Sequence, residues 1–391
     1  MNFRVDVLDA KTDRERLRRA WDQLVRTDCE TVKGHDGTSS FAWFEALTLA
    51  MPAASTSRVV VVLDGDNVVA MLPVARHAGA KRCVRLFTPT MLYGGRNGLL
   101  LRDPNPSMVV ALLDGLRQAF GAWRSLRLSL VEGSQTERLL SQACAGTSYR
   151  LLDDSERMPS PYFPLCARPE DFAAGMSKSL RQTLRTATNK LHRLGGLEYV
   201  ELSDAGGTED AIEAILKIER SSWKHEAGTA ITCRPDQERF YRTLFPLAAR
   251  SGLLYGLIGR LNGQPVAFNF GLVQGSVFCC LKHSQTTEYE GLSPGQVLNS
   301  ELLDRLRLRG VRTYDFMGRP ETHKLRWSDQ TALYTVRDAW VFGQGPCGFA
   351  GYAIHRAKRI TKEAWALLGS RQRATPVPMS QDEGGSPPRT N

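Results

Sequence analysis

Three apolar runs of strand length form the best-patterned region of the chain, in its second half. Residues 253–260 and 265–273 are rich in β-branched and aromatic side chains, and Asn262 and Gly263 between them predict a tight hairpin because both tolerate positive φ. Residues 276–283 follow as a third run. The pattern therefore predicts an antiparallel meander of three strands.

A helix and one more strand follow this meander. Leucines recur at helical spacing along residues 296–309, and Gly310 is a natural helix stop. Residues 311–317 then have the length and the apolar content of a further strand.

The first half of the chain repeats this order with an offset of about 200 residues. The helix expected at 41–50 corresponds to one at 236–247, and the turn at Gly65 corresponds to the turn at Gly263. The other elements of the first copy are strands at 58–63, 68–74, 83–88 and 125–130 and a helix at 106–120. We therefore expect two copies of one unit, each with its own core.

The segments outside the two copies suggest domain boundaries. Residues 152–169 carry four prolines and predict an extended crossover. After a strand pair at 331–343, residues 349–368 predict a basic amphipathic helix, and residues 371–391, rich in Pro, Ser, Gly and charge, predict a disordered tail. The expected division is 1–155, a degenerate first domain; 156–345, the domain with the main site; 346–370, the helix; and 371–391, the tail.

The composition is that of a globular protein in a reducing compartment. Of the 391 residues, 42% are hydrophobic and 24% charged, and no apolar run approaches the ~20 residues of a membrane-spanning helix. The N-terminal residues lack the apolar segment of a signal peptide. Eight scattered cysteines without a CxxC pair predict reduced thiols and neither a disulfide framework nor a metal site. The expected location is cytoplasmic.

The net charge of +10 favours an anionic partner. A phosphate-rich co-substrate, tRNA or a membrane face would each suit it. A basic average without any such partner is the other interpretation, and the sequence leaves both open.

Three motifs carry a resemblance to a known family. They are Ser293-Pro294-Gly295-Gln296, the strand end Tyr314-Asp315-Phe316-Met317-Gly318, and the pair His323-Lys324. Together with the order of elements, they resemble the FemAB-like branch of the GNAT superfamily, and within it the CelD-type, polysaccharide-associated acetyltransferases. The resemblance covers residues 170–345 and reaches the first half only faintly. It implies an α+β fold of tandem GNAT-like domains, each a mixed, mainly antiparallel sheet flanked by helices.

The resemblance also implies where an acyl donor would lie. In GNAT folds the third and last core strands splay apart around the pantetheine arm, so strands 276–283 and 311–317 would flank the site. The loop 287–295 would meet the donor's pyrophosphate at a helix N-terminus. The donor-binding residues implied in this way are Gly291, Ser293, Pro294, Gly295 and Gln296.

This loop departs from the usual pyrophosphate pattern. It carries Glu288 and Glu290, where the family favours Arg or Gln at the start and small residues at the end. Two carboxylates so near a pyrophosphate are unfavourable. Free CoA is therefore in doubt as the donor, and a carrier-protein thioester or an aminoacyl-tRNA stays open.

Three residues are candidate catalytic groups. His283 ends a strand beside the gap, where an imidazole can take a proton from an amine near neutral pH, although a structural histidine would fit there too. Asp315, near the end of the opposite strand, can bind or deprotonate the acceptor amine or cap the strand. Lys324 stands where the family has its lysine, which implies a role in neutralising a phosphate or the carbonyl oxygen.

Other candidates would bind substrate. His323 and Trp327 would support Lys324, and Trp223-Lys224 resembles a family element that forms a pocket wall or anchors a helix in the core.

Tyr289 lies in the expected donor loop. Lys178 and Arg181, with Arg185 further along, share a face of a helix at 177–195, which would serve either as an anion site or as a solvated basic face.

The leading hypothesis is an N-acyltransferase that moves an acyl group from a phosphopantetheine thioester, on CoA or an acyl-carrier protein, to the amine of a small molecule or amino sugar. The alternative is a FemX-like transferase that uses aminoacyl-tRNA. A third hypothesis is a non-catalytic assembly subunit that docks through the helix 349–368. None requires a metal or an integral membrane segment, and the oligomeric state stays open.

Overall fold

The computed structural model describes residues 3–24, 36–77, 83–96, 98–103, 105–165, 173–203 and 206–372. Residues 371 and 372 of the expected tail still belong to the last helix, and the rest of that tail lies outside the described residues. Cys29 and Cys166 also lie outside the described residues.

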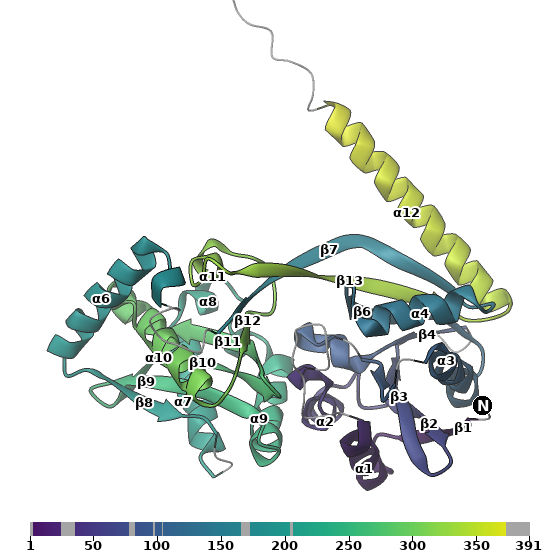
Figure 1. The fold of residues 1–391 in the computed structure, drawn as a ribbon, viewed down its shortest axis with the longest axis horizontal. Coiled ribbons are helices and arrows are strands. Elements are labelled where there is room, and N and C mark those ends of the chain that lie inside the picture. Colours follow the sequence, from purple (N-terminus) through teal and green to yellow (C-terminus); the bar gives the residue numbers. More distant parts are fainter. Residues whose placement is uncertain are drawn as a thin grey trace, which may run out of the picture.

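Strands from both halves of the chain join into one continuous sheet (Figure 1). The order of neighbours is β1-β2-β3-β4-β6-β13-β7-β12-β11-β10-β9-β8, and β5 pairs with β3. The bounds are β1 Arg4–Asp9, β2 Arg58–Asp64, β3 Asn67–Arg76, β4 Val84–Phe87, β5 Leu100–Leu101, β6 Trp123–Val131, β7 Arg150–Pro164, β8 Leu197–Glu201, β9 Leu254–Leu261, β10 Gln264–Gln274, β11 Val277–Gln285, β12 Thr313–Asp315 and β13 Ala332–Phe342.

Helices flank this sheet. The bounds are α1 Arg14–Leu24, α2 Phe41–Ala50, α3 Pro106–Phe120, α4 Gln135–Ala145, α6 Lys178–Arg193, α7 Thr208–Arg220, α8 Trp223–Glu226, α9 Pro235–Arg250, α10 Pro294–Leu308, α11 Thr322–Leu325 and α12 Pro346–Gln372, with short 3-10 turns η1 Gly37–Ser39, η2 Pro89–Gly94, η3 Ile231–Cys233 and η4 Thr287–Leu292. The sequence pattern did not predict β1, β8 or α4.

The strand order has the same pattern from either edge of the sheet, which confirms the two expected copies. β1 to β4 and β6 occupy the places that β8 to β11 and β12 occupy from the other edge, and β4–β6 and β11–β12 are both parallel pairs. The hairpin expected at Asn262 and Gly263 is present, with φ of 51° and 77° in a two-residue turn between Leu261 and Gln264.

The long strands β7 and β13 are exchanged between the copies. β7 follows the first copy along the chain but pairs with β12 of the second, and β13 follows the second copy but pairs with β6 of the first. The two also pair with each other and run side by side from one half to the other (Figure 1). The strand pair expected at 331–343 is wrong, because that segment is the single strand β13 and its partner is β7. The expected domain boundary at residue 155 falls inside β7.

Hydrophobic packing separates and also joins the copies. One buried cluster lies mainly in the first copy and another mainly in the second. A third is shared, because the equivalent helices α2 and α9 pack on each other, with the rings of Trp43 and Phe240 5.0 Å apart at their centroids. The expectation of separate cores therefore holds only in part.

A buried ionic cluster also ties the first copy to the second. Arg96, 2% exposed, pairs with Asp36 at 2.7 Å and with Asp315 at the end of β12, and both carboxylates are fully buried. The hydroxyl of Tyr334 in β13 donates to Asp315, and the guanidinium of Arg96 lies 4.6 Å from the ring centroid of Tyr334. Burial alone would lower the pKa of Arg96, but the carboxylates of Asp315 and Asp36 raise it. This cation therefore stays charged inside the protein.

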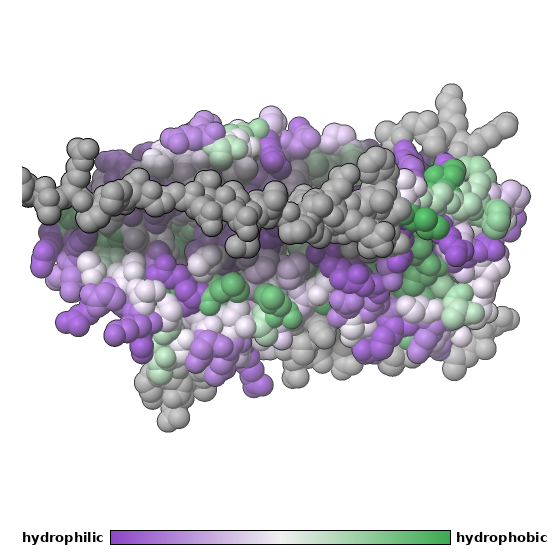
Figure 2. All heavy atoms as spheres, turned by 90° about the horizontal axis from the view of Figure 1, so that it is seen from above, coloured by the Kyte–Doolittle hydropathy of each residue, from purple (hydrophilic) through white to green (hydrophobic). Residues whose placement is uncertain are grey.

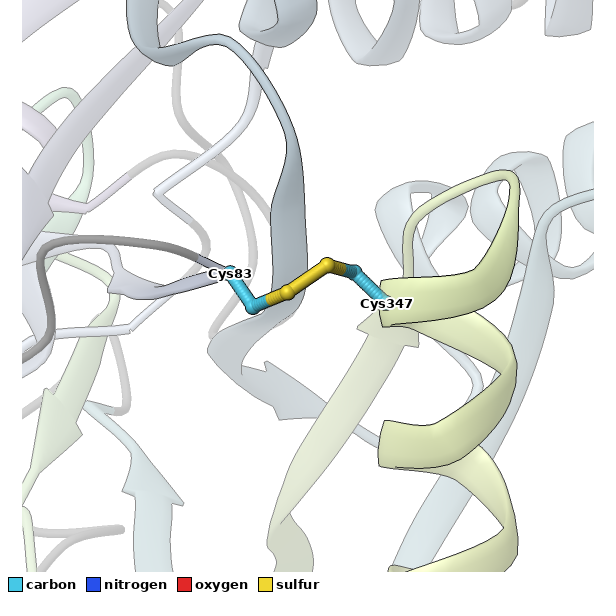
Figure 3. The surroundings of a disulfide bond; sticks show 2 residues. All are labelled: Cys83 and Cys347. Atoms are coloured by element: carbon cyan, nitrogen blue, oxygen red, sulfur yellow. A yellow bond between two sulfur atoms is a disulfide. The ribbon is translucent and has the colours of Figure 1, made fainter.

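A disulfide joins Cys83 to Cys347 (Figure 3). The two residues are 264 positions apart and their Cα atoms lie 5.5 Å apart. The expectation of reduced thiols throughout is wrong for this pair. Cys83 immediately precedes β4 and Cys347 lies in the first turn of α12, and the exchange of β13 into the first copy brings these two sites together. Spacing along the chain carries no sign of such a contact.

α12 begins against the sheet and then extends away from the body of the protein (Figure 1). Tyr352 and His355 contact the ring of Phe342, whereas Ile354 and Ile360 are 43% and 58% exposed. Figure 2 shows mostly hydrophilic residues on the face seen from above, with hydrophobic ones in smaller groups. Among the described residues, no helix is long and apolar enough to cross a membrane.

Candidate functional site

The parallel strands β11 and β12 separate after a short pairing. They pair through Val277, Phe278 and Cys279, and β12 ends at Asp315 while β11 continues to Gln285. The register of β11 against β10 shifts at this point and leaves Leu281 as an extra residue, a bulge of the kind that bends a strand. The edge of β11 beyond the bulge therefore lacks a neighbouring strand among the described residues.

A cavity of about 320 Å³ lies at this separation. Its size is at the lower end of small-molecule sites. Residues from α6, α8, β10, β11, α10 and α11 line it, together with the chain that follows β12. Of the candidate site residues, seven contribute to the lining: His283, Trp223, Lys224, Gly295, Gln296, His323 and Trp327.

The other candidates lie outside this lining. Asp315 and Lys324 are buried elsewhere, in contacts described below. Six more are not brought to the cavity: Gly291, Ser293, Pro294, Tyr289, Lys178 and Arg181.

His283 is half-buried and its imidazole is neutral at physiological pH. Burial lowers the pKa of His283 well below its ordinary value, and the nearby charges of Lys224, His323, Lys324 and Lys282 lower it further. Its Nδ1 lies 3.7 Å from the Cys280 sulfur, and its ring centroid is 5.7 Å from that of His323. A neutral imidazole on a cavity wall can accept a proton.

Lys224 binds the unpaired edge of β11. Its Nζ donates a hydrogen bond to the backbone oxygen of His283. Because the C=O and N–H of one residue point to the same side of a strand, the N–H of His283 faces the same gap. Burial lowers the pKa of Lys224, and the charge of Lys324 acts in the same direction.

A network of amide and hydroxyl groups forms part of the cavity surface. Asn269 of β10 donates to Asn299 at 2.7 Å and to the Tyr314 hydroxyl at 2.9 Å, and the Cys280 thiol donates to Asn269 at 3.4 Å. Burial raises the pKa of Cys280 to about 11, so this sulfur stays a thiol and a weak nucleophile. Neither Asn269 nor Asn299 was predicted from the sequence. A polar amide inside an otherwise apolar run was the available signal.

Asp315 and Lys324 have structural partners of their own. Asp315 pairs with Arg96, and its Oδ1 accepts a hydrogen bond from the N–H of Met317 at 2.9 Å. Lys324 donates to the backbone oxygen of Arg319 at 2.9 Å and pairs with Glu321 at 3.2 Å. Both therefore hold the segment between β12 and α11.

The N-terminus of α10 offers few free donors for a pyrophosphate. Pro294 has no N–H, the N–H of Gly295 donates to Gln285 Oε1 at 2.9 Å, and the N–H of Gln296 donates to the Ser293 oxygen at 3.1 Å. Glu290 lines the cavity beside this turn. A pyrophosphate needs free N–H groups and no nearby carboxylate, so these residues do not fit it.

α6 borders the cavity with a basic outer surface. Its Leu180 lines the cavity, and its Thr183 accepts a hydrogen bond from Arg326 at 3.4 Å. Lys178 and Arg181, which flank Leu180, are exposed, as is Arg185. None of these three forms an ion pair among the described residues.

Comparisons with known proteins agree with this architecture. Residues 178–325 match the family described as acetyltransferase (GNAT) domain. No curated protein matches the sequence. FemX has the same fold, with 13% identity and a TM-score of 0.58 over 86% of this chain and 97% of FemX.

Two further solved structures also share the fold. A conserved protein of unknown function from Bacteroides thetaiotaomicron is 13% identical, with a TM-score of 0.53 over 84% of this chain and 96% of that one. The C-terminal domain of a protein assigned as a lysylphosphatidylglycerol synthetase from Agrobacterium fabrum is 14% identical, with a TM-score of 0.50 over 89% and 96%. Residues 178–325 therefore form a domain of the acetyltransferase (GNAT) type, and the chain as a whole has the fold of FemX.

Proposed function

We propose that this chain forms an amide by moving an acyl group from a carrier-bound thioester to the amine of a small molecule. The observation that carries the proposal is the neutral imidazole of His283 on the cavity wall, beside the unpaired edge of β11. The carbonyl end of an acyl donor in this gap would meet a hydrogen-bond donor and a base at the same residue.

The chemistry assigned to the site is nucleophilic addition followed by loss of the thiolate. The amine nitrogen attacks the carbonyl carbon, and the N–H of His283 donates to the oxygen, which becomes negatively charged. The imidazole of His283 takes the proton that the nitrogen loses. The carbon–sulfur bond then breaks, and the imidazolium returns the proton to the sulfur. Lys224 fixes the strand edge on which both groups of His283 depend.

The poor fit of the α10 N-terminus to a pyrophosphate favours a donor that the chain recognises without CoA's phosphates. An acyl-carrier protein meets this condition because its own surface can dock against the enzyme. We assign Asp315 and Lys324 to the support of this site, since their side chains bind the segment that carries His323.

The test compares two acetyl donors, acetyl-CoA and the acetyl thioester of N-acetylcysteamine, which keeps the thioester end of pantetheine and lacks every phosphate. Amide formation from a panel of amines is followed by mass spectrometry. We expect kcat/KM for the two donors to agree within about tenfold, because a pyrophosphate that the enzyme does not bind contributes little binding energy. Acetyl-CoA better by a factor of about a thousand would contradict the choice of donor.

A matched pair of variants tests the site itself. His283→Gln should abolish amide formation from both donors, while His192→Gln, at an exposed histidine of α6, should leave it unchanged. Amide formation that survives His283→Gln would contradict the assignment of the base.

A second candidate is an aminoacyl-tRNA-dependent transferase. The exposed cations Lys178, Arg181 and Arg185 beside the cavity favour it, since a tRNA backbone would pair with them. It predicts tRNA binding that weakens steeply with salt and weakens further in Arg181→Gln. Binding that is absent, or indifferent to salt, would remove this candidate.

A further inference from the structure

The helix α12 packs on the sheet with one face and leaves the opposite face open. Tyr352 and His355 contact the ring of Phe342 in β13. One turn further along the helix, Nη1 of Arg359 donates a hydrogen bond to the backbone oxygen of Asp153 in β7 at 3.3 Å. Positions 352, 355 and 359 are three and four residues apart, so they share one face of the helix, and this face meets the sheet.

The open face of α12 is apolar. Its exposed residues up to Ile360 are Phe349, Ala350, Ala353, Ile354, Ala357 and Ile360. At about 3.6 residues per turn, these positions lie on the side of the helix away from the sheet. Phe349 and the two isoleucines are between 43% and 58% exposed. A surface helix ordinarily turns its apolar side toward the core, so α12 presents to the outside the side that a helix usually buries.

Cations border this apolar face. Arg356 and Lys358 are both exposed, and at helical spacing they lie along its two edges. From Pro346 to Lys362 the sequence contains no Asp or Glu. The stems of Arg and Lys side chains can lie along apolar surface while their charged ends reach into a polar layer. An apolar face with cations at its edges is the pattern of helices that lie in the interfacial layer of a membrane.

The start of α12 is fixed, so the open face keeps its direction. The bond between Cys83 and Cys347 ties the first turn of the helix to the first copy (Figure 3). The helix then leads away from the body of the protein (Figure 1), and Ile360 is the most exposed of the apolar residues named above. The sheet therefore does not cover this face.

We propose that α12 binds the surface of a membrane that contains anionic phospholipids. Its apolar face enters the layer between the headgroups and the acyl chains, and Arg356 and Lys358 reach lipid phosphates on either side of it. The inference goes beyond the proposed function, because it states where the enzyme acts and depends on no choice of acyl donor or acceptor.

Two other occupants of this face fit it less well. A second copy of α12 would bring Arg356 and Lys358 close to the same cations of the other chain, and like charges repel each other. A protein groove that encloses a helix needs access to most of its circumference, whereas the sheet already covers one side of α12 as far as Arg359. A lipid surface needs only the outer side.

Binding can be measured by co-sedimentation of the full chain with lipid vesicles. One set of vesicles is phosphatidylcholine alone, and the other mixes phosphatidylcholine with phosphatidylglycerol, which is anionic. We expect binding to the mixed vesicles to be at least about tenfold tighter than binding to the neutral ones, because each cation near an anionic surface adds to the attraction. Binding to the mixed vesicles should also weaken as salt is added.

One pair of variants tests the apolar face. Ile354→Asp combined with Ile360→Asp should abolish binding to the mixed vesicles, because it places two carboxylates in the face that enters the lipid. Leu308→Asp is the matched control, since this leucine at the end of α10 is 82% exposed and lies outside α12, and it should bind as wild type does. Far-ultraviolet circular dichroism checks that each variant keeps its helices.

A second pair tests the cations at the edges. Arg356→Gln combined with Lys358→Gln should weaken binding to the mixed vesicles by about tenfold or more and leave the weak binding to neutral vesicles unchanged. Arg319→Gln, which removes an exposed cation from the chain between β12 and α11, should retain the binding of wild type.

Three outcomes overturn the inference. The first is the absence of binding to the mixed vesicles, and the second is equal binding to both kinds of vesicle. The third is binding that survives the two aspartates in α12. Self-association in sedimentation velocity that Ile354→Asp with Ile360→Asp removes, without vesicle binding, would instead assign this face to a second copy of the chain. Failure of the proposed function would look different, since vesicle binding would be present while no amide forms from any donor.

Discussion

The buried cation that joins the two copies allows the sharpest test of the architecture. Arg96→Met keeps most of the side-chain volume and removes the positive charge. The carboxylates of Asp36 and Asp315, both fully buried, then lose the cation that each of them binds. Removing one partner of a buried ion pair costs about 3–5 kcal/mol, because the remaining charge is left uncompensated.

The expected loss of unfolding free energy is large compared with the stability of a typical domain. Since 1.4 kcal/mol is a factor of ten, about 3–5 kcal/mol lowers the ratio of folded to unfolded protein roughly a hundred- to a few thousand-fold. Single domains are typically stable by about 5–15 kcal/mol, so the variant should lose a large share of its stability.

The assay is urea unfolding followed by tryptophan fluorescence, for wild type, Arg96→Met and a control. The control is Arg157→Met, which removes an exposed arginine that pairs with Glu132 at 3.5 Å. Exposed pairs contribute about 0–1 kcal/mol, so its midpoint should stay close to that of wild type. The double variant Arg96→Met with Asp315→Asn should recover part of the lost free energy of unfolding, because it removes one of the two buried carboxylate charges that have lost their cation.

The pH dependence gives an independent check with a definite sign. Burial raises the pKa of Asp315 even beside Arg96, and without Arg96 that pKa rises further. Between the ordinary pKa of an aspartate and this raised value, the folded state binds a proton that the unfolded state does not. Stability of Arg96→Met therefore rises relative to wild type as the pH falls through that window. A loss below about 1 kcal/mol that does not change with pH would refute the reasoning.

The remaining predictions concern the site and the disulfide. Because the pKa of His283 is lowered, the acidic limb of the pH profile of kcat/KM should lie below pH 6.5. Lys224→Met should move this limb to higher pH, because it removes a cation that lowers the pKa of His283. A limb that stays in place would contradict the electrostatic effect of Lys224 on His283. Gln285→Ala should cost about 1 kcal/mol in thermal or urea unfolding, since it leaves the N–H of Gly295 without its acceptor, and no loss would contradict the capping role. Cys83→Ser should lower the free energy of unfolding by about 2–4 kcal/mol under oxidising conditions and match wild type in reductant; equal stability in both conditions would show that the bond with Cys347 is not formed.

The sequence indicated several residues of the candidate site one by one, but not how they come together in space. His283, Lys224 and Trp327 were identified from strand ends and family motifs, and the structure brings all three to one cavity. Arg326 and Ser284 also line this cavity but could not be identified, because nothing in their local sequence shows which side chains meet them in space. Those neighbours come from distant parts of the chain and are set by the tertiary fold.

The sequence by itself determined the local elements and the repeat. Hairpin turns, helix stops and hydrophobic period depend on residues a few positions apart, so the turn at Asn262 and the helix α2 could be predicted residue by residue. The similarity of the two copies likewise needs no contact between them.

The tertiary structure alone decided how the copies combine. The exchange of β7 and β13, the pairing of Arg96 with Asp315 across the copies and the bond between Cys83 and Cys347 join residues that are far apart in the chain. No local propensity selects among such partners, because the choice depends on which packing of the whole sheet buries the apolar faces and satisfies the buried charges. For this reason the sequence suggested Asp315 as a catalytic carboxylate, whereas in the structure Asp315 pairs with Arg96 and so connects the two copies.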